Sequence, residues 1–82
     1  MHTQHNLETF NTLLTEQYTE LFTTPEYSYA ANRTTPAELA KKMTLGLDQG
    51  TASKDGQGIK NVCKALGIKH TYKAIREYLT TE

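Results

Sequence analysis

Apolar side chains recur every three or four positions along most of the chain, which is the spacing of one face of an α-helix. The first of these stripes predicts a helix over residues 7–22, with Asn6 as its N-cap. Three acids, Glu8, Glu16 and Glu20, lie off the stripe and are expected to face water. The stripe itself consists of Leu7, Phe10, Leu13, Leu14, Tyr18, Leu21 and Phe22.

A second stripe predicts a helix from Pro36 to about residue 48. Thr35 is the expected N-cap, Pro36 suits the first helical position, and Glu38 can reach back as the carboxylate of a capping box. Gly50 is placed to end the helix in a left-handed turn. Gly46 costs about 1 kcal/mol relative to alanine and is expected to permit a close contact with another helix. The apolar positions are Ala37, Leu39, Ala40, Met43 and Leu47.

Two segments between the stripes are less regular. Residues 25–31 follow a threonine and begin with proline, so they predict either a short helix or an ordered loop packed by its tyrosines. Residues 50–58 are rich in glycine and small polar side chains and predict a connecting loop. Ser53 or Asp55 in this loop is expected to cap the next helix.

The C-terminal third predicts two further helices, the first beginning at residue 59 and the second covering about residues 71–80. Gly67 stops the first, and Ile68 follows it where an apolar residue closes a Schellman turn. Thr71 is the expected cap of the second helix. The buried faces are predicted to be Ile59, Val62, Cys63 and Leu66 in the first helix, and Tyr72, Ile75 and Leu79 in the second.

These patterns predict the class of fold. No segment alternates apolar and polar residues for long enough to indicate a strand, so no sheet is expected. The length of 82 residues corresponds to one domain spanning residues 1–82. The predicted fold is all-α, a small single-domain bundle of three to five short helices with a helix-turn-helix-like corner near the C-terminus.

Composition excludes several classes of protein. Apolar residues make up 37% of the chain, and no stretch approaches the roughly 18 apolar residues that a membrane span requires. The single cysteine precludes an internal disulfide. The N-terminus lacks the basic and apolar regions of a signal peptide. We therefore expect a soluble cytoplasmic protein that does not associate with membranes.

Charge is unevenly distributed, although the net charge is zero. Residues 1–40 contain five acids and one base, whereas residues 41–82 contain eight bases and four acids. This asymmetry indicates a polyanionic partner for the basic half. The alternative interpretation is that the lysines only keep the surface of a small protein soluble.

Chemistry-bearing side chains are sparse, and none forms a catalytic pattern. Residues 47–54 are similar to the phosphate loop of actin-like sugar kinases, but a chain this short cannot form their two-domain fold. His2 and His5 lack the third or fourth ligand that a metal site needs. Cys63 lies on a predicted apolar face, so we do not expect it to form a nucleophile pair with His70. The expectation is a protein that is not an enzyme and uses no cofactor or metal.

Residues 59–79 resemble a helix-turn-helix, because one helix ends in Ala-Leu-Gly-Ile and the next begins with polar residues. The resemblance implies that the second helix presents its first side chains to the major groove of duplex DNA. Lys73 departs from the family, which has an apolar residue six positions after the turn glycine. An ordinary helical corner is the alternative. The basic surface that would contact DNA or a partner consists of Lys60, Lys64, Lys69, His70, Thr71, Lys73 and Arg76.

Roughly the last fifty residues resemble small helical proteins of phages and other mobile elements, including the anti-CRISPR proteins. The similar segments read TTPAELAKKMTLGLDQGTASKDG and KALGIKHTYKAIREYL. The resemblance implies a stoichiometric blocker that binds a host nucleoprotein complex. This group shares no diagnostic motif, so the resemblance assigns no site residue.

A second candidate surface combines acids with aromatic side chains. An acidic first helix would suit the basic nucleic-acid channel of a host complex. Tyrosine and arginine are favoured anchors at interfaces, although the tyrosines could instead cover a small core. This acidic-aromatic surface consists of Glu16, Glu20, Tyr27, Tyr29 and Arg33.

Three functions are consistent with these features. The leading hypothesis is a mobile-element inhibitor of a bacterial nucleic-acid-handling defence complex. A small helix-turn-helix regulator that binds duplex DNA is the second. The third is a structural protein that forms a homodimer, since a core this small often gains stability from self-association.

Overall fold

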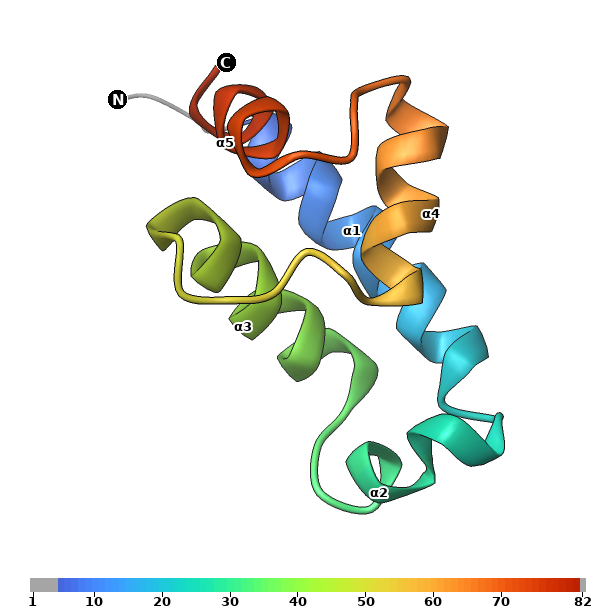
Figure 1. Cartoon of the computed structure of the whole chain (residues 1–82). Coiled ribbons are helices and arrows are strands. Elements are labelled where there is room, and N and C mark those ends of the chain that lie inside the picture. Colours follow the sequence, from blue (N-terminus) through green and yellow to red (C-terminus); the bar gives the residue numbers. More distant parts are fainter. Residues whose placement is uncertain (1–4, 82) are drawn as a thin grey trace.

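The computed structural model describes residues 5–81 and contains five α-helices and no strand within that range (Figure 1). The predicted all-α fold is therefore confirmed. The α-helices are α1 (His5–Leu21), α2 (Ser28–Ala31), α3 (Pro36–Gln49), α4 (Gln57–Leu66) and α5 (Tyr72–Thr80), and a 3-10 turn, η1 (Pro25–Tyr27), precedes α2.

Helix α1 is the element on which the other long helices pack, since α3, α4 and α5 all contact it. Helix α3 lies alongside α1 and also contacts α5, which crosses the N-terminal end of α1 (Figure 1). All four long helices contribute to one apolar cluster, which accounts for the predicted stripes. Its buried members are Phe10, Leu14, Tyr18, Ala40, Leu47, Ile59, Val62, Cys63, Ile75 and Leu79.

Two of the predicted N-caps are present. The Thr35 hydroxyl accepts a hydrogen bond from the Glu38 backbone N–H at 3.2 Å, and the Thr71 hydroxyl accepts one from the Ala74 N–H at 3.1 Å. Each bond satisfies a backbone donor that the first turn of a helix leaves unpaired. The Glu38 carboxylate accepts a hydrogen bond from the Thr34 hydroxyl at 3.2 Å, so the predicted capping box is only half formed.

The two glycine stops are also confirmed. Gly50 has φ 77° and Gly67 has φ 71°, the left-handed conformation that favours glycine. After α4, the Ile68 N–H donates to the Cys63 carbonyl at 3.0 Å and the Gly67 N–H donates to the Lys64 carbonyl at 3.2 Å. These two bonds form the expected Schellman turn.

Three local predictions were wrong, two of them because contacts between distant residues decide the outcome. Asn6 lies inside α1 rather than at its cap, and its side-chain amide donates to the Tyr78 carbonyl at 3.1 Å. Neither Ser53 nor Asp55 caps α4, since the N-cap is Gly56. Tyr72, predicted to be buried, is 41% exposed because its ring lies over the loop before α4.

Gly46 permits a close contact, but with a loop and not with another helix. A Cβ atom at this position would lie 2.7 Å from the Ala52 Cβ atom. The Gly46 carbonyl also accepts hydrogen bonds from the Thr51 and Ala52 N–H groups, at 2.7 and 3.2 Å. The loop after α3 therefore folds back directly onto the helix.

Residues 25–31, for which the sequence allowed a helix or a loop, are helical. Pro25 occupies the first position of η1, as expected, and α2 follows without a break. Helix α2 packs mainly on η1 and lies at the end of the molecule opposite α5 (Figure 1). Helices α2 and α5 therefore lie at opposite ends of the folded molecule.

Candidate functional site

The basic surface lies on α4, α5 and the turn between them. Helices α4 and α5 meet at a large angle, so the predicted helical corner is present (Figure 1). Both helices pack on α1 more extensively than on one another. Six of the predicted side chains are exposed, and His70 is half-buried. The exposed members are Lys60, Lys64, Lys69, Thr71, Lys73 and Arg76.

The loop before α4 lies against the start of α5. The His70 Nε2 atom forms a short hydrogen bond with the Lys54 carbonyl. The Tyr72 hydroxyl accepts a hydrogen bond from the Lys54 N–H at 3.3 Å, and the Lys54 ammonium lies 5.5 Å from the centre of the Tyr72 ring. His70 is thus engaged within the fold, and Lys54 lies beside the basic surface through contacts with His70 and Tyr72 that the sequence did not predict.

Most cations of the basic surface have no ion-pair partner among residues 5–81. The pair recorded in that range joins the Lys54 ammonium to the Asp55 carboxylate at 3.2 Å. The hydrogen bond and charge of Lys54 lower the pKa of Asp55. Lys69, Lys73 and Arg76 lie outside this pair, so their charge is available to an anionic partner.

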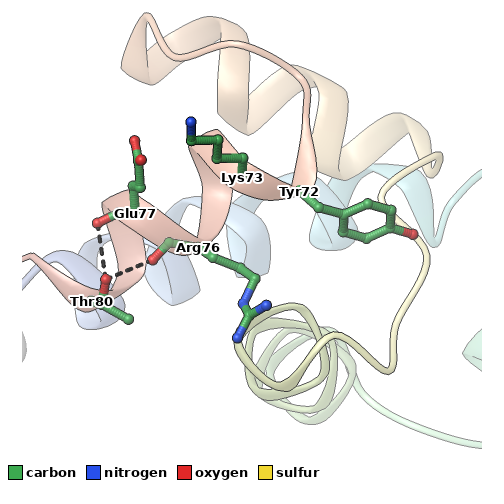
Figure 2. Close-up of a pocket in the computed structure, with 5 residues that line it drawn as sticks. All are labelled: Tyr72, Lys73, Arg76, Glu77 and Thr80. Atoms are coloured by element: carbon green, nitrogen blue, oxygen red, sulfur yellow. Dashed lines mark hydrogen bonds between the residues drawn. The ribbon is translucent and has the colours of Figure 1, made fainter.

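A wide hollow of about 430 Å³ runs along α5 and opens to solvent (Figure 2). The Arg76 side chain extends toward α3, the Tyr72 ring extends toward the loop that follows α3, and Lys73 points away from both. The Thr80 hydroxyl donates to the carbonyls of its own helix, at 2.9 Å to Arg76. The hollow suits an extended partner surface better than an enclosed small ligand.

The acidic-aromatic surface is divided by the structure. Glu16 and Glu20 are exposed on one side of α1, which contains no lysine or arginine. Tyr29 is 68% exposed on α2, and the Arg33 guanidinium lies 4.6 Å from the centre of its ring. Such a pair is a cation–π contact, and it holds two long side chains together at the surface. These four residues remain available to a partner.

Tyr27 packs against the edge of the hydrophobic core and is not part of the acidic-aromatic surface. Its ring centre lies 6.0 Å from those of both Tyr18 and Phe22, within an aromatic cluster under η1. Burial raises the pKa of Tyr27, and the neighbouring Glu26 carboxylate raises it further. The alternative in which a tyrosine covers the core is therefore confirmed for Tyr27, whereas Tyr29 stays outside.

Few side chains within residues 5–81 are arranged in a way that suits catalysis or metal binding. No three histidine, cysteine, aspartate or glutamate side chains in that range lie close enough to hold a metal ion. Cys63 is buried, and burial raises the pKa of its thiol, which disfavours the nucleophilic thiolate. His2 lies outside the described residues. None of the helices described is both long and apolar enough to cross a membrane.

A partly enclosed pocket between α1 and α3 was missed by sequence reasoning. Its volume is about 170 Å³. Asn11 Oδ1 and Thr44 Oγ1 are buried and have no hydrogen-bond partner among the described residues. Asn11 and Thr44 interrupt otherwise ordinary helical stripes, but nothing in the sequence brings them together. This α1–α3 pocket is lined by Leu7, Asn11, Lys41, Thr44 and Leu45.

The structure therefore offers three candidate sites: a basic surface at the α5 end, an acidic-aromatic surface toward the α2 end, and the α1–α3 pocket. The first two are built from exposed charges, which suits binding to a macromolecule of opposite charge. The third is a small cavity between two helices. No family model, curated protein or solved structure matches the chain.

Proposed function

We propose that the chain is a non-catalytic binding protein of a phage or mobile element, which inhibits a bacterial nucleic-acid-handling defence complex by stoichiometric binding, as anti-CRISPR proteins do. The observation that supports binding is the exposed acidic-aromatic surface on α1 and α2. The mobile-element origin rests on the resemblance over roughly the last fifty residues. In this proposal the protein occupies a channel that would otherwise hold nucleic acid.

The charge of α1 favours such a channel as the target. Glu16 and Glu20 are exposed, and neither forms an ion pair with another described residue. A nucleic-acid channel is lined by lysine and arginine side chains, which an acidic helix can approach under electrostatic steering. Tyr29 and Arg33 supply an anchor of the kind that dominates binding energy at protein interfaces.

We expect the purified protein to abolish target cleavage by an RNA-guided bacterial nuclease when about one equivalent per complex is present. Replacing both Glu16 and Glu20 with lysine should weaken inhibition at least tenfold, because the attraction becomes repulsion. The measurement is DNA cleavage by a panel of purified effector complexes, titrated with each variant.

Glu8→Lys is the matched control for these substitutions. Glu8 is also exposed on α1, but it lies near the N-terminal end of the helix, away from α2. The Glu8→Lys substitution should therefore weaken inhibition much less than the combined Glu16→Lys and Glu20→Lys substitutions. Full nuclease activity of every complex in the panel, with the protein in excess, would refute the proposal.

A DNA-binding regulator is the second candidate, favoured by the exposed cations Lys69, Lys73 and Arg76, which have no ion-pair partner among residues 5–81. It ranks second because the loop before α4 bonds to His70 and Tyr72. Those residues lie at the start of α5, the part that a recognition helix inserts into the major groove. Docking on DNA would require this loop to fit in the groove or to move.

Duplex binding tests the regulator directly. If this function holds, affinity for a random duplex should fall steeply between about 50 and 150 mM salt, because each phosphate contact releases counterions. Lys73→Ala should weaken binding and reduce the salt slope by about one, with no change in helicity. Fluorescence anisotropy measures both quantities, and an absence of binding at the lower salt concentration excludes this function.

A further inference from the structure

Two surfaces of opposite charge lie on the same chain. Residues 5–21, which form α1, contain three exposed acids and no lysine or arginine. Residues 54–77, which include the basic surface, contain six lysine and arginine side chains and two acids. One of those two acids, Asp55, is already paired with Lys54. The two acids of α1 that lie toward α2 form what we call the acidic face, which consists of Glu16 and Glu20.

The fold does not bring these two surfaces together within one molecule. Helices α4 and α5 both pack on α1, yet no ion pair joins either helix to α1 among residues 5–81. Uncharged side chains make the polar contacts there. The Asn61 amide donates to Gln17 Oε1 at 2.7 Å, and the Asn6 amide bonds to the Tyr78 carbonyl. The charges of both surfaces therefore stay in water, where another molecule can reach them.

The net charge of zero favours a second copy as that other molecule. A large net charge makes the copies of a protein repel one another, and a neutral chain lacks this barrier to association. When opposite charges are separated on a neutral molecule, two copies attract in the orientation that places the acidic surface of one on the basic surface of the other. We propose that the acidic face of α1 binds the basic surface of a second copy of this chain.

The contact is weak and depends on salt. Exposed ion pairs each contribute little to binding, and salt screens them. The expected dissociation constant is on the order of 1 mM in about 20 mM salt, and at least about tenfold higher in about 300 mM salt. The contact covers Glu16 and Glu20, so it competes with the target in the proposed inhibition, but it does not depend on that function.

Sedimentation equilibrium of the full chain at about 1 mM protein tests the proposal at both salt concentrations. The average mass should exceed that of one chain in low salt and fall to that of one chain in high salt. A single-chain mass under both conditions would overturn the proposal. Association that persists in high salt would also overturn it, because an apolar contact would then hold the copies together.

Charge reversal on the basic surface locates the contact. Lys69→Glu with Lys73→Glu should abolish association in low salt, because both side chains are exposed and would now repel the acidic face. The matched control is Lys41→Glu with Lys42→Glu, at exposed positions of α3. Each pair changes the net charge from zero to −4, yet the control should retain most of the association. An equal loss in both variants would mean that net charge alone matters, which contradicts the contact.

A second reversal should restore what the first removes. Adding Glu16→Lys and Glu20→Lys to the variant with Lys69→Glu and Lys73→Glu returns the net charge to zero and exchanges the signs of the two surfaces. All four positions are exposed, so the fold should tolerate the changes, which circular dichroism checks. The quadruple variant should associate in low salt about as strongly as the unmodified chain. A folded quadruple variant that stays monomeric refutes the contact.

The nuclease panel separates this proposal from the proposed function. If the chain associates as expected while every nuclease stays active, the contact between copies stands and the proposed inhibition fails. If the chain inhibits a nuclease but has the mass of one chain in low salt, the contact between copies alone is overturned.

Discussion

Leu14→Ala is expected to lower the free energy of unfolding by about 2–5 kcal/mol. Leu14 is fully buried in the middle of α1, and α4 approaches it so closely that a Cβ atom on Gly58 would lie 3.3 Å from its Cδ1 atom. Truncation therefore removes buried methyl groups and leaves a cavity that rigid helices cannot easily close. Urea denaturation followed by circular dichroism measures the change.

Leu45→Ala is the matched control, because the same atoms are removed from a side chain that is 53% exposed. It should change stability by less than about 0.5 kcal/mol. A domain of this size has a total stability of only about 4–12 kcal/mol, so Leu14→Ala should also expose the chain to partial unfolding at moderate temperature. If the two variants unfolded at similar urea concentrations, the core would have to lie elsewhere.

Gly46→Ala should destabilise the protein by about 1–2 kcal/mol, although alanine favours a helix by about 1 kcal/mol over glycine. The new methyl group would lie 2.7 Å from the Ala52 Cβ atom, which is fixed directly to the loop backbone. Relief of this clash requires the loop to move away and to weaken its bonds to the Gly46 carbonyl. Thermal unfolding measures the effect.

Ala52→Gly provides the rescue, because it removes the atom against which the new methyl group collides. The double variant should be more stable than Gly46→Ala alone, and the double-mutant cycle should give a coupling energy of about 1–2 kcal/mol. Additive effects of the two substitutions would show that loop and helix do not constrain each other at this point.

Signals confined to a few neighbouring residues predicted local structure well. Thr35 and Thr71 cap their helices, and Gly50 and Gly67 end theirs, because each position depends on bonds within one turn of chain. The stripe of α1 was also predictable, since its period places Phe10, Leu14 and Tyr18 on one face.

Contacts between distant segments could not be predicted in this way. Asn6 has the chemistry of a cap, but it bonds to Tyr78, and Tyr72 has the spacing of a core residue, but it lies over a loop. Both outcomes depend on how α5 is placed against the remainder of the chain.

The candidate sites also divide into features that the sequence predicted and features that it did not. The exposed charges of α1, α4 and α5 could be predicted from helical periodicity, as could their separation into acidic and basic halves. The α1–α3 pocket could not, because neither Asn11 nor Thr44 stands out in a sequence rich in threonine. The pocket exists only because the fold places the residues of α3 beside those of α1.

The central place of α1 has a consequence for folding during synthesis. The ribosome produces α1 before α5, yet the N-terminal half of α1 is covered by α5, and Asn6 and Tyr78 are bonded across 72 positions of sequence. Until Ile75 and Leu79 emerge, the apolar stripe of α1 lacks part of its cover and is open to chaperones, proteases and other nascent chains. A chain truncated before Tyr72 would therefore leave this part of the stripe exposed permanently and be prone to aggregation and proteolysis.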